Sequence, residues 1–241
     1  YFDKMYATVT SMLAKSGTIE HPYLKPQASG KKAVIVVTSN RGLAGGYNAS
    51  VIKLITGSDL KPDDLLLYTV GNKGKEYFQH REYTIAKDYS EVIENPMFSD
   101  AKEICEEVLG GYAAGEISEI YLAYTYFKNT VVHEPKLLKL LPVEIEEADI
   151  EAAKADSLMN YEPEETEALE IIIPKYVTSI LYGALVEAIA SENGARMQAM
   201  DSATSNAQDM IDHLTLQYNR ARQGSITQEL TEIIAGANAI Q

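Results

Sequence analysis

The residues with the clearest potential for chemistry form a glycine-rich segment. Residues 39–46 read Ser-Asn-Arg-Gly-Leu-Ala-Gly-Gly and follow the apolar run 33–37 directly. A glycine-rich turn between a strand and a helix can bind phosphate through its backbone N–H groups. Here no Lys-Ser/Thr pair follows the glycines, as a P-loop requires, and their spacing does not match G-x-G-x-x-G. Residues 71–75 fail for the same reason. We therefore interpret residues 39–46 as a tight strand–helix turn and predict no cofactor-binding residues.

The other side chains that could catalyse a reaction or bind a metal are scattered. The four histidines, His21, His80, His133 and His213, have no second histidine or carboxylate at ligand spacing, so we predict no metal site. The chain has no G-x-S-x-G motif. Its single cysteine, Cys105, has no evident base and lies among glutamates that disfavour a thiolate, so we expect a buried and unreactive thiol. These patterns predict no catalytic residues.

The charge of the chain limits its partners. The 241 residues contain 21 Lys and Arg against 35 Asp and Glu, which gives a formal net charge of −14. No basic stripe is available to neutralise phosphates, which argues against nucleic-acid binding. The acidic runs 144–149 and 162–165 are interpreted as solvated faces. We find no 18-residue apolar run and no signal peptide, and we expect a chain in the cytoplasm or inside a compartment.

The middle of the chain alternates between strand and helix patterns. Strands are predicted at residues 33–37, 65–70, 120–127 and 131–143, the last broken near Pro135. Helices are predicted at residues 47–56, 73–80 and 100–114. This alternation is typical of a mostly parallel sheet with right-handed crossovers. We expect residues 144–173 to be less regular, with short helices.

Residues 174–241 predict one very long helix. Pro174 suits its first turn, because the missing N–H would be unpaired there. Apolar residues recur at alternating spacings of three and four from Met197 to Ala221, and the register slips past Gly224. Such a helix would extend on the order of 100 Å. Its charges argue against a membrane span, so we expect partners around it.

Four glycines interrupt this helix, at Gly183, Gly194, Gly224 and Gly236. Each costs about 1 kcal/mol relative to alanine in a helix. We expect packing against other chains to explain them.

The first residues read as the end of another helix. Phe2, Met5, Val9 and Met12 have coiled-coil spacing, and Ser16-Gly17 is a suitable helix end, so we expect this helix to begin before Tyr1. The predicted fold is α/β, with a Rossmann-like sheet flanked by long N- and C-terminal helices that form an antiparallel coiled coil. The predicted parts are the end of the N-terminal helix (1–16), the α/β domain with an acidic connector (17–172) and the C-terminal helix (173–241).

Several segments resemble one protein family. Residues 191–206 and 216–235 closely resemble the C-terminal signature of the gamma subunit of F-type ATP synthases. Residues 39–48 resemble that family's Ser-Asp-Arg-Gly-Leu-Cys-Gly-Gly turn, with Asn40 and Ala44 where Asp and Cys are usual. Tyr161-Glu162-Pro163 fits its Tyr-Glu-Pro element. The resemblance covers nearly the whole chain, and the absence of the chloroplast paired-cysteine insertion points to a bacterial member.

The resemblance implies a central stalk, or rotor, that couples ion flow through a membrane c-ring to ATP synthesis in an alpha–beta hexamer. It implies one copy per complex, an epsilon-subunit partner, and a peripheral position at the cytoplasmic face of the bacterial cell membrane, held there only through the complex. The coupling ion, proton or sodium, stays open. Catalysis would belong to the beta subunits. The positions that the resemblance assigns to partner binding are Arg222, Gln223 and Thr227 at a beta-subunit loop, Ile233 and Ile240 in an apolar bearing, and Tyr161 and Glu162 near epsilon and the c-ring.

Two other functions stay compatible with the residues alone. One is a small nucleotide-binding α/β protein with a coiled-coil dimerisation helix, which would bind ATP as an isolated chain. The other is a coiled-coil scaffold, which would form stable homodimers.

Overall fold

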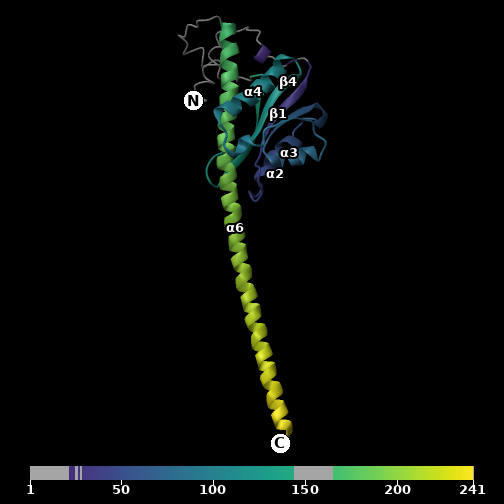
Figure 1. Cartoon of the computed structure of the whole chain (residues 1–241), viewed down its shortest axis with the longest axis vertical. Coiled ribbons are helices and arrows are strands. Elements are labelled where there is room, and N and C mark those ends of the chain that lie inside the picture. The colour runs from purple at the N-terminus through teal and green to yellow at the C-terminus, as the bar shows by residue number, and fades with distance from the viewer. Residues whose placement is uncertain (1–21, 25–26, 28, 144–164, 241) are drawn as a thin grey trace. The chain divides into compact units, whose positions relative to one another are not determined.

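The computed structural model describes residues 22–24, 27, 29–143 and 165–240 (Figure 1). The helix predicted at residues 1–16 and most of the acidic connector, with Tyr161 and Glu162, lie outside the described residues. The chain divides into two compact units, Tyr1–Arg196 and Met197–Gln241.

A five-stranded sheet forms the centre of the first unit. Its strands are β1 (Lys31–Val37), β2 (Leu65–Val70), β3 (Ile85–Asp88), β4 (Ile117–Phe127) and β5 (His133–Leu141), in the order β3-β2-β1-β4-β5. All neighbours pair in parallel except β4 and β5, which are antiparallel. The predicted mostly parallel sheet is therefore confirmed. The strand order reverses between β1 and β4, and the carboxyl ends of such strands are where open α/β sheets usually bind ligands.

Strand β5 corrects one prediction. The predicted break near Pro135 is wrong, because Pro135 lies inside β5 and pairs with Thr125 of β4. Strand β5 is at the edge of the sheet, where the N–H that proline lacks can face away from the neighbouring strand.

Helices cover both faces of the sheet. They are α2 (Tyr47–Thr56), α3 (Asn72–Gln79), α4 (Phe98–Ala113) and the first part of α6 (Glu165–Ile240), with short 3-10 helices η1 (Pro22–Leu24), η2 (Pro62–Asp64) and η3 (Val92–Glu94). Helices α2 and α3 pack on one face, and α4 and α6 pack on the other (Figure 1). Strand β1 is apolar from Ala33 onward, where both of its faces are buried. Val34 and Val36 face α2, whereas Ile35 and Val37 face α4.

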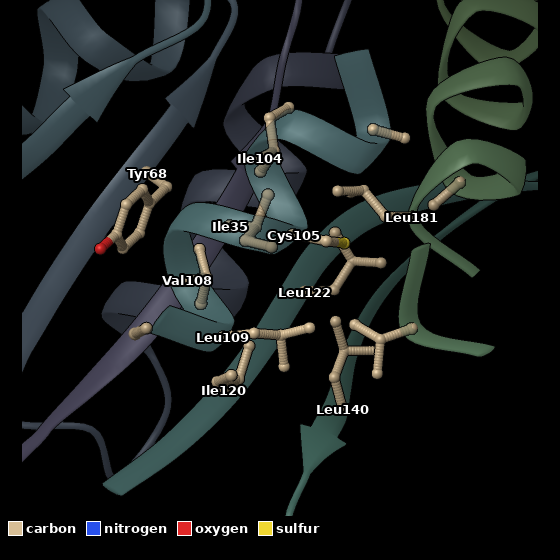
Figure 2. Packing of buried hydrophobic residues seen from close by; sticks show 14 of the residues in the cluster. Ile35, Tyr68, Ile104, Cys105, Val108, Leu109, Ile120, Leu122, Leu140 and Leu181 are labelled. Carbon is tan, nitrogen blue, oxygen red and sulfur yellow. The ribbon is translucent and has the colours of Figure 1, made fainter. Parts of the chain in front are cut away.

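The larger core lies between the sheet, α4 and α6. Figure 2 shows Ile35 and Leu122 of the sheet packed against Cys105 and Val108 of α4, with Leu181 of α6 beside them. Cys105 is 1% exposed, and burial raises the pKa of its thiol to about 12. The prediction of a buried cysteine is confirmed, and its low reactivity stays a prediction.

The long helix begins earlier than predicted. It begins at Glu165, so the prediction that Pro174 opens it is wrong. A proline inside a helix removes one backbone hydrogen bond and costs about 3 kcal/mol. Buried apolar residues at a spacing of four lie on both sides of Pro174, with Leu169 and Ile173 before it and Val177 after it. Their packing on the sheet holds the helix together through the proline.

One stretch of α6 is apolar enough to cross a membrane by length and composition alone, although no 18-residue apolar run was predicted from the sequence. Within the structure 44% of this stretch is buried. The apolar stripe from Leu169 to Ala188 belongs to the protein core, and this packing accounts for its composition.

Candidate partner-binding surface

The glycine-rich turn connects β1 to α2 at the carboxyl edge of the sheet. The Ser39 N–H donates to Oδ1 of Asn48 (2.9 Å), and the Ser39 hydroxyl donates to the Arg41 carbonyl (2.6 Å). Leu43 and Gly45 have φ values of 63° and 56°, in the left-handed region that tight turns use. The segment is the strand–helix turn that the sequence predicts.

The polar groups at this edge bind one another. At the start of α3 the N–H of Asn72 donates to Oδ1 of Asn40 (2.9 Å), and the N–H of Gly74 donates to Oγ1 of Thr38 (2.9 Å). The N–H of Lys73 donates to the carbonyl of Ser39 (3.0 Å). The free N–H groups of a helix N-terminus are what usually bind a phosphate. At α3 the protein itself occupies them.

A cavity of about 330 Å³ lies beside the turn. It is lined by Asn40, Arg41, Ile93, Glu94, Ile189, Glu192, Asn193 and Arg196. Arg196 forms an ion pair with Glu192 at 2.6 Å. With two arginines and two glutamates, the lining has no charge bias that would attract a phosphate or a cation.

No metal centre is found in the part of the chain that the structure describes. No three His, Cys, Asp or Glu side chains gather there as ligands would.

The second unit, Met197–Gln241, is a helix that exposes large apolar side chains. Nine of them are at least 49% exposed from Met210 onward: Met210, Ile211, Leu214, Leu216, Tyr218, Ile226, Leu230, Ile233 and Ile234. Ile211, Leu214 and Tyr218 keep the predicted spacing of three and four, and Ile226, Leu230 and Ile233 continue it in the shifted register. Large exposed apolar surfaces in soluble domains usually mark interaction sites.

The predicted partner residues of this unit lie on the same helix. Arg222, Gln223 and Thr227 are exposed, and their side chains make no hydrogen bond or ion pair within the described residues. Gln223 and Thr227 are one turn apart on one face. Ile233 is 67% exposed. Ile240 is the last residue of α6.

Comparison with known proteins identifies the family. Residues 1–240 match the family described as ATP synthase. An ATP synthase gamma chain from Lachnoclostridium phytofermentans is 63% identical over 246 residues, which cover 100% of this chain and 84% of that protein. The chain belongs to the ATP synthase gamma chain family.

Other gamma chains are also similar over the whole chain. The sodium ion specific ATP synthase gamma chain of Acetobacterium woodii is 41% identical over 256 residues, covering 100% of this chain and 85% of that protein.

Solved structures show the same fold. A chain of the Euglena gracilis mitochondrial ATP synthase matches with a TM-score of 0.67 at 16% identity, covering 98% of this chain and 88% of that one. A chain of the Tetrahymena thermophila central stalk and c-ring structure matches with a TM-score of 0.56 at 24% identity, covering 83% of this chain and 99% of that one.

Sequence reasoning missed how this gamma chain holds its long helix. The phenol of Tyr47 in α2 donates to the carbonyl of Ala188 in α6, 141 residues further along the chain. The only sign of this hydrogen bond in the sequence is that position 47 is a tyrosine, because an aliphatic residue could fill the same buried site without a hydroxyl. Nothing in the spacing of residues indicates its partner.

Proposed function

We propose that this gamma chain is the non-catalytic central stalk, or rotor, of a bacterial F-type ATP synthase. It would transmit rotation between a membrane c-ring and the catalytic alpha–beta hexamer, as one copy per complex, with epsilon as a further partner. Its place would be at the cytoplasmic face of the cell membrane, where only the complex holds it. The observation that carries this proposal is the second unit, a helix with apolar residues exposed over its whole length, in a family member matched from residue 1 to 240.

The chemistry of the described residues supports a mechanical role. The N–H groups at the start of α3 bind Thr38, Ser39 and Asn40, so the protein's own groups occupy the helix N-terminus that could bind a phosphate at this edge of the sheet. This argues against the small nucleotide-binding protein that the sequence also allowed.

The mechanism follows from the two registers of the helix. The apolar stripe changes direction near Gly224, so the helix presents different side chains around its circumference. Inside a ring of three beta subunits such a helix touches each one differently. Each orientation then favours a different nucleotide affinity in each site, which is coupling through differential contacts. Rotation exchanges these states among the three sites.

Arg222, Gln223 and Thr227 are proposed to bind a beta-subunit loop, and Ile233 and Ile240 to fill an apolar bearing. Tyr161 and Glu162 are proposed to contact epsilon and the c-ring. A charge-assisted contact such as that of Arg222 contributes roughly 1.5–3 kcal/mol. Losing it should therefore weaken assembly or coupling without unfolding the chain.

The test is co-purification of the tagged chain with alpha and beta subunits, followed by ATP-driven ion pumping in vesicles. The variant Arg222→Ala/Gln223→Ala should lower assembly or the pumping per ATP. Arg220→Ala/Gln217→Ala removes the same residue types two and six residues earlier in the same helix and serves as the matched control. Absence of alpha and beta from the purified chain would refute the rotor proposal. Normal pumping by the double variant would refute only the assignment of those two residues.

A further inference from the structure

Below the apolar packing of α6 on the sheet, polar and close backbone contacts to this helix gather between Ala188 and Arg196. The phenol of Tyr47 donates to the Ala188 carbonyl (3.1 Å), and the hydroxyl of Ser191 donates to the Thr125 carbonyl of β4 (3.3 Å). Tyr47 is 5% exposed and Ser191 is fully buried. Both hydrogen bonds are therefore shielded from water, which makes their loss costly.

One turn further along, the backbone of α6 lies against the β4–β5 hairpin. A Cβ added to Gly194 would lie 2.6 Å from Cε1 of His133 and 3.2 Å from the carbonyl oxygen of Thr130. Any other residue here would require the His133 ring to move. The expectation that this glycine packs against another chain is wrong, because its neighbour is the protein's own β5.

The glycine-rich turn contacts the helix at Arg196. The guanidinium of Arg196 donates to the carbonyl of Gly42 (3.5 Å) and is held by its ion pair with Glu192 (2.6 Å). The side chains of Arg196 and Glu192 are 28% and 14% exposed, so solvent only partly screens this pair.

These two loops contact nearly opposite sides of the helix. Successive residues of an α-helix are rotated by about 100°, so Gly194 and Arg196 point about 200° apart. A helix that merely lies on a sheet is contacted on one face. Here the hairpin touches one side and the turn touches the other.

Both loops are internally braced. In the hairpin, Oδ1 of Asn129 accepts from the N–H groups of Val131 (2.9 Å) and Val132 (2.8 Å), and Lys128 pairs with Glu134 (3.0 Å). In the turn, Nδ2 of Asn40 donates to the Ser90 carbonyl (2.9 Å), which ties the turn to the segment after β3. Surface loops are usually mobile, and these contacts restrict both loops.

We propose that the glycine-rich turn (residues 39–46) and the β4–β5 hairpin (residues 128–132, with His133) form a clamp that fixes α6 against rotation in the α/β domain. Turning the helix about its axis would replace Gly194 by a residue with a Cβ, which would have to displace the His133 ring. Gly194, His133 and Arg196 are thus positioning residues of a joint that carries torque. This inference rests on the proposed rotor function.

The test compares variants of this chain in the assembled ATP synthase, reconstituted into vesicles. Gly194→Ala should leave ATP hydrolysis close to wild type and lower the ions pumped per ATP, because the added methyl group displaces His133 and loosens the hold on the helix. The double variant Gly194→Ala/His133→Ala makes room for the new methyl group and should recover most of the pumping. Wild-type pumping by Gly194→Ala, or a double variant no better than the single one, would refute the clamp.

A second pair of variants covers the case in which Gly194→Ala fails to assemble. Arg196→Ala removes only a side chain at the other side of the clamp and should also lower pumping per ATP. Arg41→Ala, in the same turn but without a hydrogen bond or ion pair to α6, is its matched control and should pump normally. Equal pumping by these two variants would refute the clamp. If instead the wild-type chain does not assemble or pump, the rotor proposal itself fails.

Discussion

Gly194 of α6 lies so close to His133 of β5 that a Cβ on the glycine would be 2.6 Å from the imidazole Cε1. Gly224 and Gly236 of the same helix have no atom within 4 Å of such a Cβ. The three glycines look alike in the sequence. Among the described residues, only the neighbours of Gly194 give a structural reason for a glycine.

The isolated chain should respond in opposite ways to alanine at two of these positions. Gly224→Ala should stabilise α6 by about 1 kcal/mol, because alanine has the higher helix propensity. Gly194→Ala should destabilise the first unit, because overpacking typically costs about 1–3 kcal/mol and outweighs that gain. Urea unfolding followed by circular dichroism measures both. Equal stabilisation by the two substitutions would show that His133 moves aside freely.

Asp88 should make the edge of the sheet sensitive to acid. Burial alone would raise the pKa of this carboxyl, but its hydrogen bonds from Lys75, Ser90 and Thr69 outweigh burial and lower it. A pKa lowered by folding gives stability that is present above the unfolded pKa and is lost as pH falls through the folded one. The substitution Asp88→Asn should therefore lower the free energy of unfolding most at neutral pH. This effect should shrink below about pH 4. A loss independent of pH would contradict this.

Glu187 should have the opposite pH dependence. Burial raises the pKa of its carboxyl, against the opposing effects of Lys136 and the Phe127 N–H, and its Oε2 has no hydrogen-bond partner within the described residues. A pKa raised by folding means that the stability contribution is present below the unfolded pKa and is lost as pH rises through the folded one.

Glu187→Gln should thus raise the unfolding free energy at pH 8 and change it little at pH 4. Denaturant unfolding at the two pH values measures this. Glu170→Gln, at an exposed position of the same helix, is the control and should have little effect at either pH.

Cys105 should resist thiol reagents while the chain is folded. Its pKa of about 12 and its 1% exposure leave almost no accessible thiolate at pH 8. Reaction with an aromatic disulfide should be slow in buffer and should approach that of a free thiol in guanidinium. Rapid labelling in buffer would show that the core around α4 opens readily.

Local sequence patterns predicted the strands and helices whose buried residues follow a regular spacing or an unbroken run. Strand β1 and helix α2 were found because β-branched runs and helical spacing depend only on neighbouring residues. Strand β3 was missed, since its four residues include a single large apolar side chain, Ile85. The start of α6 was misplaced because Pro174 is a strong local signal, whereas the packing that overrides it comes from strands far away in the sequence.

The candidate partner-binding surface could likewise be predicted only in part from the sequence. The spacing of Ile211, Leu214 and Tyr218 predicted an exposed apolar stripe that needs a partner. The roles of Arg222, Gln223 and Thr227 came from the resemblance to the gamma chain family and stay predictions. The contacts of Ala188, Gly194 and Arg196 could not be predicted, because each joins α6 to a residue more than 60 positions away in the chain.

The glycine-rich turn and the β4–β5 hairpin also bear on how the family can evolve. Loops at a protein surface usually accept insertions and deletions, because few contacts depend on their length. These two loops meet the helix from opposite sides, so the space between them must match the width of one helix. A residue added to or removed from either loop would misplace Gly42 or Thr130. We therefore expect changes of length among gamma chains to accumulate in other connections and to spare these two loops.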